Sequence, residues 1–178
     1  MDETFEQYKE RIRGYVGRRD PMKILRETAA LLRRLIVRKP PALLTRRPAP
    51  DTWCVAEILA HLADTELVLG YRMRSVLARP GKAIESIDQA LWAKVLTYAS
   101  IEPQSSIRRF REMRQGNLEL MARLTAEQWQ LYGEHSERGR ETLRDMAVLY
   151  AGHDLNHADQ VRRIVSSAAE PAAERRAG

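Results

Sequence analysis

Long segments with helical periodicity, separated by a few clusters of Gly and Pro, constrain the fold of this chain more than any other feature. Apolar residues recur at spacings of three and four, which places them on one face of an α-helix, and the alternation typical of strands is absent. The long helices are predicted at 21–36, 52–77, 103–124 and 141–167, and short helices at 3–15, 87–97 and 125–129. Each long helix carries one apolar stripe and must therefore pack against the others.

The four long helices predict an all-α fold, an antiparallel up-down four-helix bundle with short additional helices. The proline-rich segment 39–50 is expected to be a loop between helices, because neither side of it would form a stable core alone. One domain over residues 1–178 is therefore expected, with its core in 20–167 and a disordered tail at 168–178. The segment 133–140 is expected to be a polar loop.

The composition excludes several other classes of protein. Of the 178 residues, 44% are hydrophobic and 30% are charged, a balance typical of a globular chain rather than a disordered one. The single cysteine excludes a disulfide framework and a cysteine-rich zinc module. No stretch reaches the roughly 18 apolar residues of a membrane span, and the charged N-terminus lacks the apolar region of a signal peptide. A cytoplasmic protein is expected.

The basic charge is concentrated at one end of the chain. The formal net charge is +6, and the first 50 residues hold 13 Lys and Arg against 6 Asp and Glu. Such a segment could contact the phosphates of a nucleic acid. Aromatic residues make up only 6% of the chain, however, too few to form a stacking platform among the basic clusters. The sequence therefore favours a solvated helix surface, and nucleic-acid binding is not expected.

Three of the four histidines lie where two predicted helices can bring them together. His153 and His157 are one helical turn apart on the core side of the last helix, a spacing that lets two imidazoles bind one metal ion. His61 borders the core stripe of the helix 52–77, which can lie beside the last helix in a bundle. The sequence thus predicts an open three-histidine site for a divalent metal, Zn or Ni, with Fe or Mn as alternatives.

Polar neighbours could orient these imidazoles. Glu57 and Asp64 lie on the same side of their helix as His61, and Gln160 falls near the histidine face of the last helix. Asp154 points further round that helix. The alternative is that the acids are surface groups, or that the histidines form hydrogen bonds to an interior acid such as Asp64 instead of binding a metal.

Five other residues have a structural and a functional interpretation. His135 is interpreted as a surface loop residue, with a place near the mouth of the site as the alternative. Cys54 is interpreted as a small buried residue rather than a thiol activated by a helix N-terminus, and Trp53 as a core anchor. Arg140 and Arg144 are candidates to hold an anionic cosubstrate, although arginines on helix surfaces are usually solvated.

The segments DTWCVAEILAHLADTE and HSERGRETLRDMAVLYAGHDLNHADQV resemble the DinB-like superfamily of metal-dependent proteins, also called the YfiT-like or DNA-damage-inducible family. The first resembles the family's Trp-led segment with a His on the second helix. The second resembles its loop with Gly and Thr-Leu, followed by H-x-x-x-H and a Gln three residues on. The resemblance covers most of residues 20–167 and implies a four-helix bundle with His61, His153 and His157 as metal ligands.

The resemblance also implies a range of activities, because members of the family include S-transferases that use low-molecular-weight thiols, and a thiol-dependent isomerase. We therefore expect a metal-dependent enzyme, an S-transferase or a hydrolase, in which the metal activates a thiol cosubstrate or water for attack on an electrophilic small molecule. Dimers are frequent in the family, so a homodimer is expected. The alternative is a non-catalytic bundle that binds a metal or ligand, with a role in stress response; a fourth protein ligand, Glu57 or Asp64, would favour it.

Overall fold

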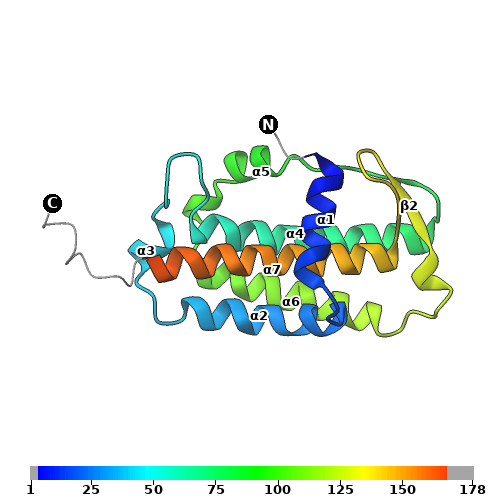
Figure 1. Ribbon diagram of the computed structural model, residues 1–178, viewed down its shortest axis with the longest axis horizontal. Coiled ribbons are helices and arrows are strands. Elements are labelled where there is room, and N and C mark those ends of the chain that lie inside the picture. The colour runs from blue at the N-terminus through cyan, green and yellow to red at the C-terminus, as the bar shows by residue number, and fades with distance from the viewer. Residues whose placement is uncertain (1–3, 168–178) are drawn as a thin grey trace, which may run out of the picture.

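The computed structural model describes residues 4–167, so the tail expected at 168–178 lies outside the described residues. Most of the described chain is helical (Figure 1). The α-helices are α1 (Phe5–Val16), α2 (Pro21–Ile36), α3 (Pro41–Thr45), α4 (Val55–Ala78), α5 (Gln89–Val95), α6 (Pro103–Met121) and α7 (Leu143–Ser167). Short 3₁₀ turns lie at Tyr98–Ser100 and Gln128–Gln130, and three strands at β1 (Ala83–Ile84), β2 (Tyr132–His135) and β3 (Gly139–Thr142).

Capping side chains define the start of α2 and of the second 3₁₀ turn. Asp20 accepts a hydrogen bond from the Met22 N–H at 2.9 Å, directly before a proline at the first position of α2. Thr125 and Gln128 form a capping box at the second 3₁₀ turn, since each side chain accepts a hydrogen bond from the other residue's N–H. The proline-rich loop contains the five-residue helix α3, which the periodicity did not indicate.

The four long helices α2, α4, α6 and α7 form a bundle, which confirms the predicted fold class (Figure 1). α2 and α7 run in one direction, and α4 and α6 run in the other. The contacts between α4 and α6 agree with this parallel direction, because a later residue of α4 contacts a later residue of α6. Asp64 pairs with Arg109, and Glu66 pairs with Asn117. This parallel pair differs from a sequential up-down order, because the connection 79–102 returns along the whole bundle before α6 begins.

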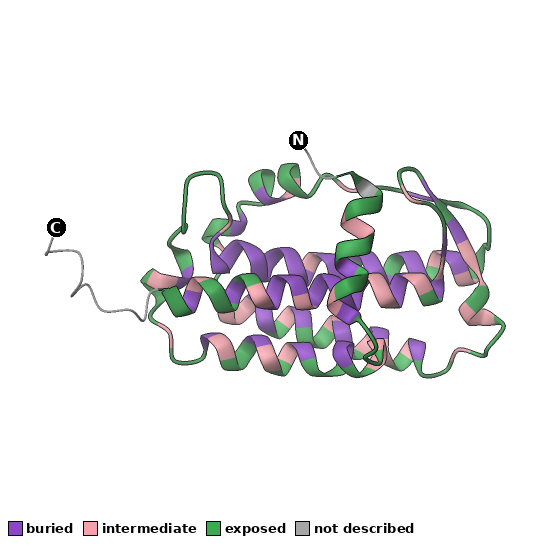
Figure 2. Ribbon diagram, viewed as in Figure 1, coloured by how far each residue is buried: buried purple, intermediate pink, exposed green. Residues whose placement is uncertain are grey.

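Two apolar clusters fill the bundle, one at each end. α4 shows the division, since one cluster contains its residues Val55, Ile58, Leu59, Leu62 and Ala63 and the other contains Leu69, Met73 and Val76. A smaller third cluster joins Ala60 of α4 to Ala93 and Tyr98. Figure 2 shows that buried residues are concentrated in the long helices. Between the two clusters lies a layer of buried polar side chains, which we call the central polar layer. Its members are Thr28, His61, Thr65, Glu66, Arg114, Asn117, His153, Asp154, Asn156 and His157.

The segment expected as a polar loop at 133–140 is instead most of a β-hairpin, so that expectation is wrong. β2 pairs with β3 in antiparallel register, and β1 adds to β2 in parallel. The inward positions of β2 are Gly133 and His135, which give no hydrophobic alternation for a sequence pattern to detect. Main-chain pairing over four residues, rather than an apolar face, defines these strands.

α1 lies across α7 where α7 carries a glycine (Figure 1). A Cβ atom on Gly152 would stand 2.1 Å from the carbonyl oxygen of Ile12, so the crossing needs a residue without a side chain. Ile12 is completely buried in this contact. Within residues 4–167, none of the helices combines the length and the apolar character needed to cross a membrane.

Candidate metal centre

His61 on α4 and the pair His153 and His157 on α7 meet in the central polar layer. The Nε2 atom of His153 lies 3.0 Å from Nε2 of His61 and 3.1 Å from Nε2 of His157. One nitrogen from each ring lies within 4.8 Å of the others, and all three residues are buried. The structure therefore brings together the three histidines that the sequence singled out.

Capping side chains define where α4 and α7 begin. The carboxylate of Glu57 accepts a hydrogen bond from the Cys54 N–H at 2.9 Å and so caps the first turn of α4. Thr142 and Asp145 cap α7 in the same reciprocal way, at 3.0 and 3.2 Å. Since α4 and α7 are antiparallel neighbours, one histidine of α4 faces two successive turns of α7.

The imidazoles are neutral, and His157 presents the lone pair of its Nε2 atom to the other two rings. The Nδ1 atom of His157 lies 2.9 Å from the amide oxygen of Gln160, which only accepts, so Nδ1 carries the proton and Nε2 is free of one. Burial lowers the pKa of His157 to about 4, although Gln160 raises it in part. Burial also lowers the pKa of His61 and His153, and the neighbouring histidines lower both further. These are the states that a divalent cation needs in its ligands.

The donor set fits a divalent metal ion. Nitrogen ligands at about 2.0–2.1 Å from a tetrahedral zinc ion stand roughly 3.3 Å apart, which is close to the observed spacing. The Nδ1 atom of His153 is buried and has no hydrogen-bond partner among residues 4–167. A cation between the three Nε2 atoms accepts a lone pair from each ring, which a single shared proton cannot do.

Trp53 packs against two of the histidines. Its ring is stacked over the ring of His157, with centroids 6.4 Å apart and planes at 16°. It also contacts the ring of His61 at 4.9 Å. The residue therefore joins the apolar cluster around α4, as the sequence indicated, and in addition covers one side of the histidines.

Glu57, Asp64 and Gln160 were expected to orient the histidines, and Gln160 contacts His157. The carboxylate of Glu57 is engaged by the Cys54 N–H and by the guanidinium of Arg47. The carboxylate of Asp64 accepts a hydrogen bond from the Tyr98 hydroxyl at 2.7 Å. Both acids thus bind groups outside the histidine cluster.

Two cavities reach the histidines from different directions. One has a volume of about 350 Å³ and is lined by His153 together with Thr65, Arg72, His135, Arg138 and Tyr150. The other has a volume of about 650 Å³ and is lined by His157 together with Trp53, Ile58, Gln160 and Ile164. The first lies toward the C-terminal part of α4 and the second toward its N-terminal part, so the cluster stands between a polar and a more apolar space.

His135 is not a surface residue, so that interpretation is wrong. It lies on β2, is buried, and lines the smaller cavity with His153, as the alternative had it. Arg140 stacks over the ring of Tyr132 at 3.9 Å, and Arg144 is exposed. The arginines that line this cavity are Arg72 and Arg138.

Cys54 is buried, as expected. Burial raises the pKa of its thiol, and the nearby Glu57 carboxylate adds to that effect. The thiol is therefore protonated at neutral pH and is unsuited to act as a nucleophile.

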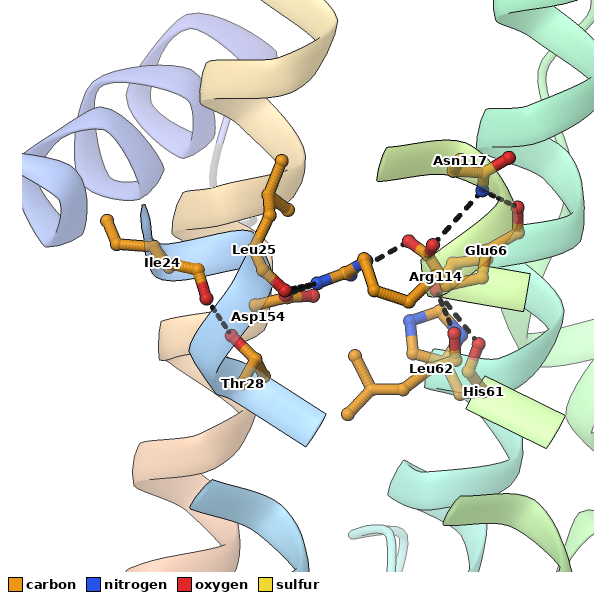
Figure 3. Close-up of polar contacts among 10 residues, drawn as sticks. Ile24, Leu25, Thr28, His61, Leu62, Glu66, Arg114, Asn117 and Asp154 are labelled. Carbon is orange, nitrogen blue, oxygen red and sulfur yellow. Dashed lines mark hydrogen bonds and ion pairs between the residues drawn. The ribbon is translucent and has the colours of Figure 1, made fainter. Parts of the chain in front are cut away.

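A second buried cluster in the central polar layer escaped the sequence analysis (Figure 3). Arg114 of α6 donates to the carboxylates of Asp154 at 2.7 Å and Glu66 at 2.8 Å, and to the carbonyl of Leu25 at 2.8 Å. Burial lowers the pKa of Arg114, but Asp154 and Glu66 raise it by more, so the guanidinium stays charged. Its position four residues after the buried Phe110 indicated an inward side chain.

Comparison with known proteins identifies the family. The model of the DinB superfamily matches residues 24–161, so the chain belongs to that superfamily. A protein of Halalkalibacterium halodurans, described as a predicted metal-dependent hydrolase, is 22% identical over 122 residues, which cover 68% of this chain and 71% of that protein. A protein of Oceanobacillus iheyensis with the same description is 22% identical over 124 residues, 70% of this chain and 71% of that protein.

A solved structure has the same fold. YfiT from Bacillus subtilis, described as a probable metal-dependent hydrolase with an unusual four-helix bundle topology, superposes with a TM-score of 0.79 at 19% identity. The superposition covers 96% of this chain and 92% of that chain.

Proposed function

We propose that this protein is a metal-dependent enzyme that uses one divalent ion held by His61, His153 and His157. The observation that carries the proposal is the convergence of three buried Nε2 atoms, at 3.0 and 3.1 Å around His153. The descriptions of the relatives and of YfiT as metal-dependent hydrolases support it. Three imidazoles leave coordination positions open, which is typical of catalytic rather than structural sites.

When bound, a divalent ion in such a site lowers the pKa of a coordinated water or thiol and so supplies a nucleophile at neutral pH. The chain itself fixes the ligands: Gln160 holds the tautomer of His157, and Trp53 packs on the side of the cluster away from the smaller cavity. The two cavities give an electrophilic small molecule and a second reactant separate approaches to the cluster.

The proposal includes zinc or nickel as the ion and water or a low-molecular-weight thiol as the activated group. Hydrolysis is supported by the relatives' descriptions, and thiol transfer by the family resemblance of the histidine segments. A homodimer, a cytoplasmic location and a role in stress response stay predictions from the sequence.

The metal content of a histidine variant tests the proposal. We expect the wild type, produced without a histidine tag, to hold one divalent ion per chain in elemental analysis, and His157→Ala to hold none. His135→Ala is the matched control, because it removes a buried histidine outside the cluster and should keep the ion. A His157→Ala protein with unchanged metal, or a wild type that binds none of the four candidate ions, would contradict the proposal.

A further inference from the structure

The smaller cavity contains a buried cation that is not matched by an acid. Arg72 lies on α4, three turns after His61, and only 6% of it is exposed. Its guanidinium donates to the Tyr150 hydroxyl at 3.4 Å and to the carbonyl oxygen of Glu85. Among the described residues, no carboxylate forms an ion pair with Arg72. The other charged residues that line this cavity are Glu137, which is exposed, and Arg138, which pairs with Glu141. Arg72 therefore lacks a buried counter-charge among the described residues, and a buried charge without one is unfavourable.

His135 presents a second donor at the same place. Its Nδ1 atom accepts a hydrogen bond from the Glu137 N–H at 3.1 Å. Burial lowers the pKa of His135 to about 4, and the charges of Arg138 and Arg72 contribute, so the ring is neutral and its one proton is on Nε2. That Nε2 atom lies 3.5 Å from Nη2 of Arg72. Two N–H groups that face each other cannot bond to one another, but they can share an acceptor placed between them.

Tyr150 supplies a third donor. Its hydroxyl oxygen accepts from Arg72, which leaves its own proton to be donated. A phenol keeps its proton at neutral pH, so this donor is present. The residue stands one turn before His153 on α7, with the two rings 6.3 Å apart. The donors therefore lie in the same cavity as the histidine cluster and directly beside it.

We propose that Arg72, His135 and Tyr150 form a subsite for an anionic oxygen group, a carboxylate or a phosphate, on the small molecule that reacts at the histidine cluster. The inference rests on the proposed function, because it assigns the substrate of that same site. An incoming anion matches the unpaired charge of Arg72 and accepts from all three donors. A cavity of about 350 Å³ holds a small acid, whose reactive atom then lies only a few bonds from its anionic group.

Anion binding to the metal-free protein tests the subsite, since no ion is then present to hold the anion. Inorganic phosphate and acetate are titrated separately, and binding is followed by NMR shifts of the amides of β2. We expect saturable binding of at least one of them, weakened about tenfold or more by Arg72→Gln, because charged hydrogen bonds are lost. Arg79→Gln, an exposed change at the end of the same helix, should leave the affinity unchanged.

Tyr150→Phe is a milder variant that keeps the shape of the cavity, and it should weaken binding severalfold. Equal affinity in the wild type, Arg72→Gln and Tyr150→Phe, or no saturable binding of either anion, overturns the inference. If acetate binds more tightly, the subsite is assigned to a carboxylate, and if inorganic phosphate binds more tightly, it is assigned to a phosphate group. Metal content measured on the same samples separates the two proposals: anion binding without any metal uptake contradicts the proposed function alone, and metal uptake without anion binding contradicts the subsite alone.

Discussion

Arg114 connects four helices at the depth of the histidines. It belongs to α6 and contacts Glu66 of α4, Asp154 of α7 and the Leu25 carbonyl of α2 (Figure 3). Asp154 directly follows His153 in the chain, so the same ion pairs that hold the helices together also fix the turn of α7 that carries the histidines. A buried cation with two carboxylates is a demanding arrangement, because each charge depends on the others.

Removing this cation should destabilise the protein strongly. Arg114→Met leaves Glu66 and Asp154 buried without a counter-charge, and we expect a loss of about 3–5 kcal/mol in the free energy of unfolding measured with urea. Arg109→Met removes a half-exposed pair with Asp64 at 3.7 Å and should cost less than about 1 kcal/mol. Equal losses in the two variants would show that the buried network does not hold the bundle together.

At the level of single residues, the sequence predicted the histidine cluster and missed Arg114. The histidines could be found because two of them share one helical face on the core side of their helix. Imidazoles expected to be buried need polar partners, which a metal site would supply. Arg114 escaped because an arginine is usually read as solvated, although it lies in line with Ile107 and Phe110 on its helix. His135 escaped because its burial depends on a hairpin that has no hydrophobic pattern.

At the level of secondary-structure elements, the crossing of α1 over α7 places part of the wall of the smaller cavity. Tyr8 of α1 lines that cavity, and α1 is held against α7 at Gly152. The carbonyl of Ile12 is main chain, so a side chain at Gly152 cannot be accommodated by a rotamer change and must move the whole of α1.

We therefore expect Gly152→Ala to destabilise the protein despite the higher helix propensity of alanine. Overpacking costs about 1–3 kcal/mol, and each kcal/mol lowers the Tm by about 2–4 °C in a protein of this size. Gly116→Ala is the control, since nothing lies within 4 Å of its new Cβ atom and the gain in propensity should raise the Tm slightly. A Gly152→Ala protein as stable as the Gly116→Ala protein would place α1 further from α7 than described.

For the whole molecule, the titration of the histidines makes stability depend on pH. His135, His153, His157 and His61 all have pKa values below the usual 6.5 because they are buried, so the folded state binds protons less readily than the unfolded chain. The contribution of these neutral histidines to the free energy of unfolding is therefore fully present above about pH 6.5, and it is lost progressively as the pH drops toward 4. His135 and His157, whose pKa values are lowered to about 4, each contribute a slope of up to about 1.4 kcal/mol per pH unit within that window.

Urea unfolding of the metal-free protein at pH 7.5, 6.0 and 5.0 measures this dependence. We expect the free energy of unfolding to fall at each step, and His135→Phe to show a smaller decrease because one of the titrating groups is absent. A stability that stays constant or rises as the pH falls would contradict the neutral, buried state of these imidazoles.

The order of the helices in the bundle could not be predicted from local patterns. Periodicity and caps place each helix in the chain, and they gave the four long helices close to their observed bounds. The adjacency of α4 and α7, on which the histidine cluster depends, results from the connection 79–102 that runs back along the bundle. That route is chosen by the packing of the whole chain, and no residue of the connection specifies it alone.

This returning connection also carries Ser86, Ile87 and Gln89, which line the smaller cavity beside His153. The histidines belong to rigid bundle helices, whereas this part of the cavity wall belongs to a segment that contributes little to either apolar cluster. Substitutions in this wall are therefore expected to leave the arrangement of the three histidines unchanged. Such a division lets the wall of a cavity change in shape and charge while the scaffold keeps the three histidines in place.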